Sequence, residues 1–172
     1  MRNVLLVNLL LLAVALAAWG EYTAVRTRLT AQQEAIGTEW AQVDLAMQAR
    51  ADLVSKLILP PGPKDESMPA REEARGAVAE LERALAPADK IRANSELSAA
   101  LAKLPRPKSE EALDRLSDAE NRIAVERRRY NEMLEHYNAL IQRFPDNIVA
   151  RLAGFQRDPN YLPTEEQEPV QK

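Results

Sequence analysis

The stretch AENRIAVERRRYNEMLEHYNALIQRFPDN, residues 119–147, contains the pair Tyr-Asn twice, seven residues apart. One set of residues in and around this stretch, its predicted packing seam, recurs in alternating steps of three and four. This is the period of helices that pack at a shallow angle. The stripe consists of Leu113, Leu116, Glu120, Ile123, Arg127, Tyr130, Leu134, Tyr137, Ile141 and Phe144. It predicts a long helix, from Ser109 to about Arg143, that packs against other long helices.

The repeated pair has a structural interpretation. Tyr130 and Tyr137 fall on the stripe, where their rings would fill core volume while each phenol needs a polar partner or water. Asn131 and Asn138 lie beside it, where a side-chain amide could bridge to a neighbouring helix or its loop. We interpret the repeat as packing rather than as a ligand contact.

Two members of the stripe, Glu120 and Arg127, are charged. If they are buried, each needs a partner, and Arg50 and Asp52 on the first helix are the natural candidates. A polar layer of this kind can fix the register of packed helices. The alternative, which we favour from sequence, is that the stripe is partly open and these groups are solvated.

The composition favours an all-α domain. Of 172 residues, 46% are apolar and 28% charged, as in a globular domain with a core, and the low aromatic and glycine content favours helix over sheet. The net charge is −3, whereas a domain that binds nucleic acid usually concentrates positive charge. We therefore expect no nucleic-acid partner. The absence of Cys excludes disulfides, a thiol nucleophile and Cys-ligated metal.

Residues 3–20, NVLLVNLLLLAVALAAWG, carry no charged side chain. As a helix they would span about 27 Å, at the short end for a hydrocarbon core of about 30 Å. Trp19 and Tyr22 stand where aromatic residues anchor spanning helices. Residues 1–20 are therefore predicted to be a single-pass membrane anchor, and the flanking charges leave the side of the membrane undetermined, with a lean toward the extracytoplasmic side. The alternative is a signal peptide cleaved near Ala17.

Proline-rich stretches divide the remainder. The first helix, residues 21–59, should end at LPPGPKDES, because proline cannot continue helical hydrogen bonding. A middle helix from about Ser67 to Leu104 is expected to break or kink at Pro87. Similar lengths and short connections predict an antiparallel bundle of three long helices, or four if the middle one is counted as two.

The chain should end in a short helix and a tail. A helix through NIVARLA would stop at Gly154, which suits a left-handed cap, followed by Phe155. This closes the predicted bundle domain at residues 21–155. Residues 156–172 are rich in proline and acid, so we predict a disordered acidic tail.

No pattern of catalytic, cofactor-binding or metal-ligating residues stands out. His136 is the one histidine, and with Glu132 it supplies only two of the ligands that a zinc site needs. The arginines at 127–129 point about 100° apart on a helix and form no single basic surface. There is no phosphate-binding glycine loop and no nucleophile motif. We therefore expect no enzyme activity, no cofactor and no metal.

Two further stretches carry a family resemblance. Residues 39–58, EWAQVDLAMQARADLVSKLI, combine a Trp, a following Val, an Arg and the pair DL, and residues 118–155 combine ENRI, an arginine-rich turn, YN twice, a proline and a closing Gly-Phe. Both resemble the signatures of the LemA family of single-pass bacterial membrane proteins. The resemblance implies an amino-terminal membrane helix, an antiparallel helical bundle and no assigned enzymatic activity. It also suggests association with other membrane-bound proteins, including envelope proteases, through neighbouring genes.

These observations predict a non-enzymatic, membrane-anchored bundle that acts as an interaction or scaffold protein of the bacterial envelope. Its expected partners are membrane lipid and another membrane or envelope protein, and homo-oligomers are possible. The alternatives are a secreted or periplasmic helical binding protein released by cleavage, and a regulator whose packing is switched by the seam charges. The candidate polar-layer or interaction residues are Trp40, Arg50, Asp52, Glu120, Asn121, Arg127, Tyr130, Asn131, Tyr137 and Asn138.

Overall fold

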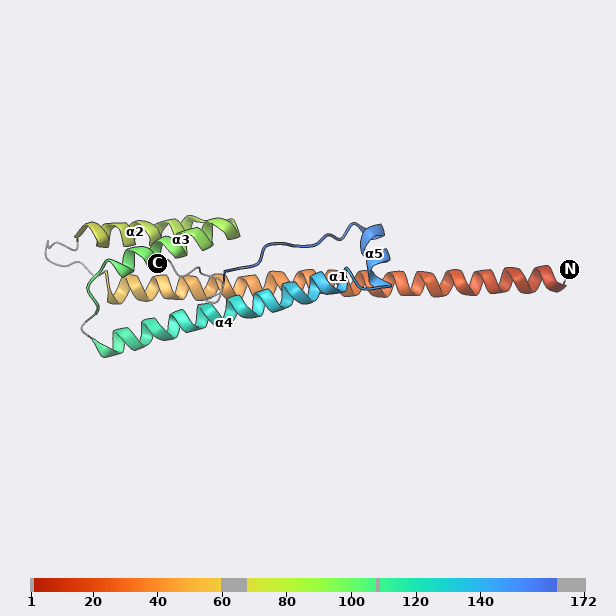
Figure 1. The fold of residues 1–172 in the computed structure, drawn as a ribbon, viewed down its shortest axis with the longest axis horizontal. Helices are drawn as coiled ribbons and strands as arrows, with labels where there is room; N and C mark the ends of the chain where they lie inside the picture. The colour runs from red at the N-terminus through yellow and green to blue at the C-terminus, as the bar shows by residue number, and fades with distance from the viewer. Residues whose placement is uncertain (1, 60–67, 108, 164–172) are drawn as a thin grey trace, which may run out of the picture. The chain divides into compact units, whose positions relative to one another are not determined.

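The computed structural model describes residues 2–59, 68–107 and 109–163. Its helices, in chain order, are α1 (Arg2–Leu57), α2 (Met68–Arg83), α3 (Pro87–Ala102), α4 (Glu110–Leu140) and α5 (Asp146–Ala153) (Figure 1). No strand occurs within these described ranges. The predicted all-α class is confirmed.

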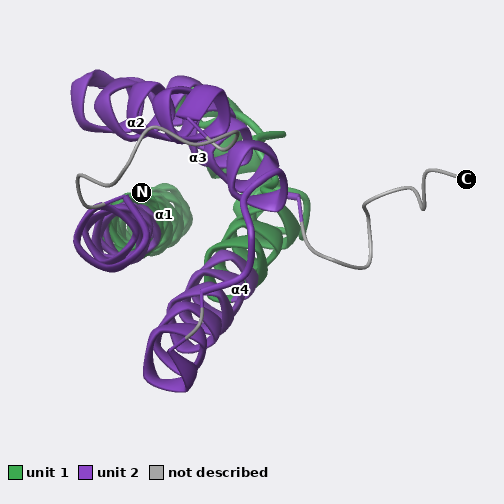
Figure 2. Cartoon of the chain, turned by 90° about the vertical axis from the view of Figure 1, so that its left-hand side faces the viewer, with its two compact units in different colours: residues 1–39, 129–162 green, residues 40–128, 163–172 purple. Residues whose placement is uncertain are grey.

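The chain divides into two compact units (Figure 2). Unit 1 comprises residues 1–39 and 129–162, and unit 2 comprises residues 40–128 and 163–172. The long helices α1 and α4 each contribute one part to unit 1 and another to unit 2.

The middle of the chain, in unit 2, is a helical hairpin, which corrects the prediction of one long helix broken near Pro87. Helices α2 and α3 run side by side in opposite directions (Figure 1), and residues 84–86 make the reversal. Pro87 is the first residue of α3, where its missing N–H costs nothing, and Ala86 before it is extended, as proline requires. The predicted start near Ser67 lies outside the described residues.

The core of unit 2 is rich in small side chains. Buried alanines occur on all of its helices, and they let helix backbones approach closely. They are Ala46, Ala51, Ala70, Ala74, Ala77, Ala93, Ala100, Ala112 and Ala119. Larger buried residues, including Met47, Leu81 and Leu97, fill the space between them.

Helix α4 largely follows the predicted stripe. The Ser109 hydroxyl accepts a hydrogen bond from the Ala112 backbone N–H at 3.3 Å, which caps the helix as such a residue should. Ile123, Tyr130, Leu134, Tyr137 and Ile141 of the stripe are buried. Phe144 is 74% exposed, so its predicted place in the core is wrong. The reason is that α4 ends at Leu140 and the helical period ends with it.

Unit 1 combines parts of α1 and α4 with α5 and the segment that follows it. Helix α5 stops at Gly154, whose φ of 79° is left-handed, and the Phe155 N–H bonds to the Ala150 carbonyl at 2.9 Å. The predicted glycine stop is therefore confirmed.

The first part of α1 is apolar and unpacked. Its large side chains from Val4 to Leu16 and that of Trp19 are all more than half exposed. The rings of Trp19 and Tyr22 lie 5.9 Å apart. The chain thus has an amino-terminal helix that is long and apolar enough to cross a membrane.

Candidate functional site

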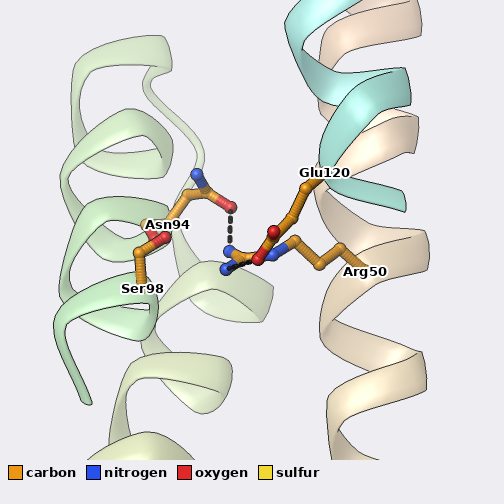
Figure 3. Close-up of polar contacts among 4 residues, drawn as sticks. All are labelled: Arg50, Asn94, Ser98 and Glu120. Atoms are coloured by element: carbon orange, nitrogen blue, oxygen red, sulfur yellow. Dashed lines mark hydrogen bonds and ion pairs between the residues drawn. The ribbon is translucent and has the colours of Figure 1, made fainter. Parts of the chain in front are cut away.

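A buried arginine joins three helices of unit 2 (Figure 3). Arg50 of α1 is only 3% exposed. Its Nη1 donates to Oδ1 of Asn94 on α3 at 3.2 Å, and its Nη2 donates to Oε1 of Glu120 on α4 at 3.1 Å. The planar guanidinium reaches both acceptors at once, which an ammonium group could not do with the same geometry.

The two acceptors stand in different surroundings. Asn94 is buried, whereas the Glu120 side chain is 53% exposed. Glu120 therefore supplies the balancing charge while keeping much of its hydration, which lowers the desolvation cost of the pair. The backbone carbonyl of Asn94 accepts a hydrogen bond from the Ser98 hydroxyl at 3.1 Å, within the same helix (Figure 3).

A second ion pair links α3 to α1 in unit 2. The Lys90 ammonium contacts the Asp44 carboxylate, and the side chains are 11% and 21% exposed. Lys103, just after α3, pairs with Glu73 of α2 at 2.7 Å on the surface. Sequence analysis singled out none of these four residues, nor Asn94, because each looks locally like an ordinary polar residue of a helix surface.

The other predicted polar-layer residues differ in burial and position. Asp52 is exposed and pairs with Lys56 of its own helix at 3.7 Å, not with a residue of α4. Arg127 and Trp40 are half-buried, and Asn121 is exposed. The favoured expectation of a solvated Glu120 is only half right, because this carboxylate is largely exposed yet bonded to Arg50.

In unit 1, two asparagines of α4 hold an extended segment. Asn138, which is 3% exposed, donates from Nδ2 to the Asp158 carbonyl at 2.7 Å and accepts the Asp158 N–H at 2.9 Å. Asn131 makes the same pair of bonds to Leu162, both at 2.8 Å. Each amide thus pairs with one residue's backbone as a neighbouring strand would.

The spacing of these contacts explains the Tyr-Asn repeat. Seven residues of helix advance by roughly 10 Å, and four residues of extended chain span roughly 13 Å. An extended chain that bends slightly can therefore meet Asn138 with Asp158 and Asn131 with Leu162. We name residues 156–162 the strap.

Tyr137 and Tyr161 complete the attachment of the strap. The phenol of Tyr137, which is 1% exposed, donates to the Gln156 carbonyl at 2.9 Å and accepts from Gln33 Nε2 of α1 at 3.2 Å. The phenol oxygen of Tyr161 accepts from Asn138 Nδ2 at 3.1 Å. The prediction of disorder from residue 156 is therefore wrong for the strap, while residues 164–172 lie outside the described chain.

The pKa values of the two seam tyrosines, Tyr130 and Tyr137, are both raised. Burial raises the pKa of Tyr130 above its usual value of 10.0, and the nearby Asp158 carboxylate raises it further. Burial also raises the pKa of Tyr137, the hydrogen bond from Gln33 lowers it, and Asp158 raises it. The net result is that folding favours the neutral phenols.

An ion pair attaches α5 to α1. Asp146, in the first turn of α5, contacts the Arg28 guanidinium at 3.4 Å, and its side chain is only 7% exposed. Nothing local in the sequence indicates that the two meet.

Two open pockets lie in unit 1. One, of about 520 Å³, is lined by Gln33, Ile36, Tyr137 and Gly154 together with strap residues. The other, of about 420 Å³, is lined by Gln32, Glu39, Arg129, Glu132, Met133 and His136. Neither lining contains a serine, threonine, cysteine or lysine that could serve as a nucleophile. No group of three metal-ligating side chains occurs in the part of the chain that the structure describes.

Replacing Arg50 with Lys should lower the free energy of unfolding by about 1–3 kcal/mol, because one ammonium cannot serve both the buried Asn94 and the partly exposed Glu120 with the same geometry. The measurement is urea unfolding of the full chain in detergent micelles, followed by helical circular dichroism. Arg92→Lys is the matched control, since the Arg92 side chain is 65% exposed and pairs with Asp89 and Glu96 of its own helix. Equal stability of the two variants would contradict a structural role for the Arg50 cluster.

Replacing Asn138 with Ala should release the strap, because it removes three hydrogen bonds and leaves the Asp158 backbone groups without their side-chain partner. We expect amide hydrogen exchange at residues 156–162 to quicken by about ten-fold or more. The control is Asn121→Ala on the exposed face of the same helix. If the strap amides exchange alike in both variants, the asparagine does not hold it.

Stability should fall at high pH. Because the folded pKa values of Tyr130 and Tyr137 lie above the unfolded value of 10.0, the folded chain holds more protons above that pH. Their contribution is complete below about pH 10 and is lost as the pH rises through the raised values. Urea unfolding at a series of pH values from about 8 to about 11 measures this loss of stability. Tyr137→Phe should flatten the decline, and an unchanged slope would refute the assignment.

Comparison with known proteins gives one relationship. No curated protein matches the chain. The profile of the LemA family matches residues 39–171, and so includes the α2–α3 hairpin as well as the two stretches that carried the resemblance. This family is not known as an enzyme family. The match covers most of the chain, which therefore belongs to the LemA family.

Proposed function

We propose that this protein is a single-pass membrane protein whose helical bundle acts as a non-catalytic scaffold for another membrane or envelope protein. The observation that carries the proposal is the uniform exposure of the apolar side chains along the first part of α1. The rest of the chain supports a structural role.

The exposure pattern along α1 changes at one place. From Val4 to Leu16 every large apolar side chain is at least half exposed, whichever way it points from the helix. From Val25 onward one stripe of α1 is buried, and it includes Val25 and Leu29, which are fully buried. A helix that is apolar all round is stable in lipid, whereas water would impose a large hydrophobic cost on it.

The polar groups of the bundle support a scaffold rather than an enzyme. Arg50, Asn94 and Asn138 are buried and bonded to other parts of the chain. A group committed to such bonds is not available for proton transfer or nucleophilic attack without breaking the packing. The chemistry of these residues thus serves rigidity, and a rigid bundle on an anchor suits the presentation of a surface.

The alternative is a secreted or periplasmic binding protein. It is favoured by the small residues Ala15 and Ala17, which suit a signal-peptide cleavage site. In that case the mature chain would begin near Ala18 and carry no anchor.

Extraction of membranes with alkaline carbonate separates the two. The full chain should stay in the pellet, and mass spectrometry should find its amino-terminal residues intact. Replacing Leu10 and Leu11 with Arg should move the chain to the soluble fraction, since each central Arg costs about 2.5–3.5 kcal/mol on insertion. Leu10→Ile with Leu11→Ile is the matched control.

A soluble native chain that starts near Ala18 would overturn the anchor. For the scaffold role, the bundle purified in mild detergent should retain a specific envelope protein and lose it when unit 2 is destabilised. Absence of any such partner would count against that role. A tag at the carboxy terminus of the protein, tested for protease access in cells whose outer layer has been opened, reports the side of the membrane that carries the bundle.

A further inference from the structure

Helix α5 carries an apolar face that no described residue covers. Ile148 and Leu152 lie one helical turn apart on α5, Phe144 lies two residues before the helix, and these three residues are 51%, 73% and 74% exposed. Val149 and Ala150 are buried on the other side of the helix. Two large apolar side chains on α5, with that of Phe144 just before the helix, form an exposed apolar patch of the kind that marks a binding surface.

The position of α5 relates this face to the apolar segment of α1. Within unit 1, α5 lies across α1 at the end that faces the apolar segment (Figure 1), and the ion pair from Asp146 to Arg28 joins the two helices. Arg28, the residue of α1 that bonds to α5, lies eight residues beyond Gly20. Eight residues of helix correspond to about 12 Å.

Because a helix is about 10–12 Å wide, the side of α5 nearer the apolar segment lies about 6–7 Å beyond Gly20, at the height of the polar layer of a bilayer. The headgroup region on each side adds about 5–8 Å to a hydrocarbon core of about 30 Å. A helix at this height that crosses a spanning helix lies roughly in the plane of the membrane surface. Amphipathic helices in that position bury their apolar face by about 5–10 Å at the boundary between headgroups and acyl chains.

The charges beside the face also suit a lipid surface. Arg143 and Arg151 immediately precede Phe144 and Leu152 and are exposed. The acidic residue of α5, Asp146, is buried against Arg28 and does not oppose them. A cationic rim around an apolar face is attracted by anionic headgroups.

We propose that Phe144 and α5 form a second membrane contact, with Phe144, Ile148 and Leu152 in the bilayer interface and Arg143 and Arg151 against anionic headgroups. The inference rests on the proposed anchoring by α1. A second copy of the chain could also cover an apolar face, but the height of α5 above the apolar segment and its cationic rim favour lipid.

The absence of native Cys allows a clean test. Single variants Leu12→Cys, Ile148→Cys and Leu85→Cys, each labelled with an environment-sensitive fluorophore, report the anchor, the α5 face and an exposed loop of unit 2. The full-length chain is placed in nanodiscs holding one copy each, made of phosphatidylcholine with phosphatidylglycerol. Quenching is measured with lipids that carry a spin label at the headgroup or deep in the acyl chain.

The proposal predicts that the headgroup spin label quenches the fluorophore at position 148 by about two-fold or more, while the fluorophore at position 85 is unaffected and that at position 12 responds to the deep label. Leu152→Glu should reduce quenching at position 148, whereas Leu85→Glu should not. Omitting phosphatidylglycerol should also weaken the quenching at position 148.

Other outcomes overturn the inference in distinguishable ways. Quenching at position 12 without quenching at position 148 leaves the anchor intact and refutes the contact of α5. A blue-shifted label at position 148 that depends on protein density in vesicles, with no lipid quenching in nanodiscs, assigns the face to a second copy. Lack of quenching at position 12 refutes the anchor itself and the inference that rests on it.

Discussion

One helix, α1, constrains both units because it must meet two different surroundings along its length. Its first part is apolar on every side, and the remainder buries one stripe and bonds to its neighbours through single polar residues. In unit 1, Arg28 and Gln33 bond to Asp146 and Tyr137. In unit 2, Asp44 and Arg50 perform the same task toward α3 and α4. Each polar contact fixes the register of a helix that apolar packing alone would leave free to slide.

Periodicity predicted the long helices well because it is a local property. The steps of three and four along α4 locate its buried face without knowledge of its neighbours, and the Ser109 cap is recognisable by itself. Pro87 is a different case, since proline is equally compatible with a kink and with the first turn of a new helix. The choice between them depends on the packing of α2 against α3, a tertiary effect that no local window of sequence displays.

The strap shows why composition gave a wrong prediction of disorder. Residues 156–162 contribute one buried apolar side chain, Leu162, so counting core residues predicts disorder. Their order comes instead from backbone groups bonded to Asn131 and Asn138 on another element. The sequence did place both amides beside the seam, but the residues that they would bind could not be inferred. The same holds for Asn94, whose partner Arg50 had been identified as part of a polar layer with Glu120.

The placement of polar residues also bears on how such a bundle acts. A single spanning helix restricts the height of the attached domain but not its tilt, because side chains in lipid have no specific partners. The Arg28–Asp146 pair and the strap make α5 part of the same packed unit as the part of α1 that follows its apolar segment. A second contact through α5 would therefore convert attachment at one point into attachment along a surface, so that tilting the unit would require apolar side chains to leave the interface. The proposed scaffold would gain from this restriction, because a partner embedded in the same membrane would then meet a fixed face of unit 1 at lower entropic cost.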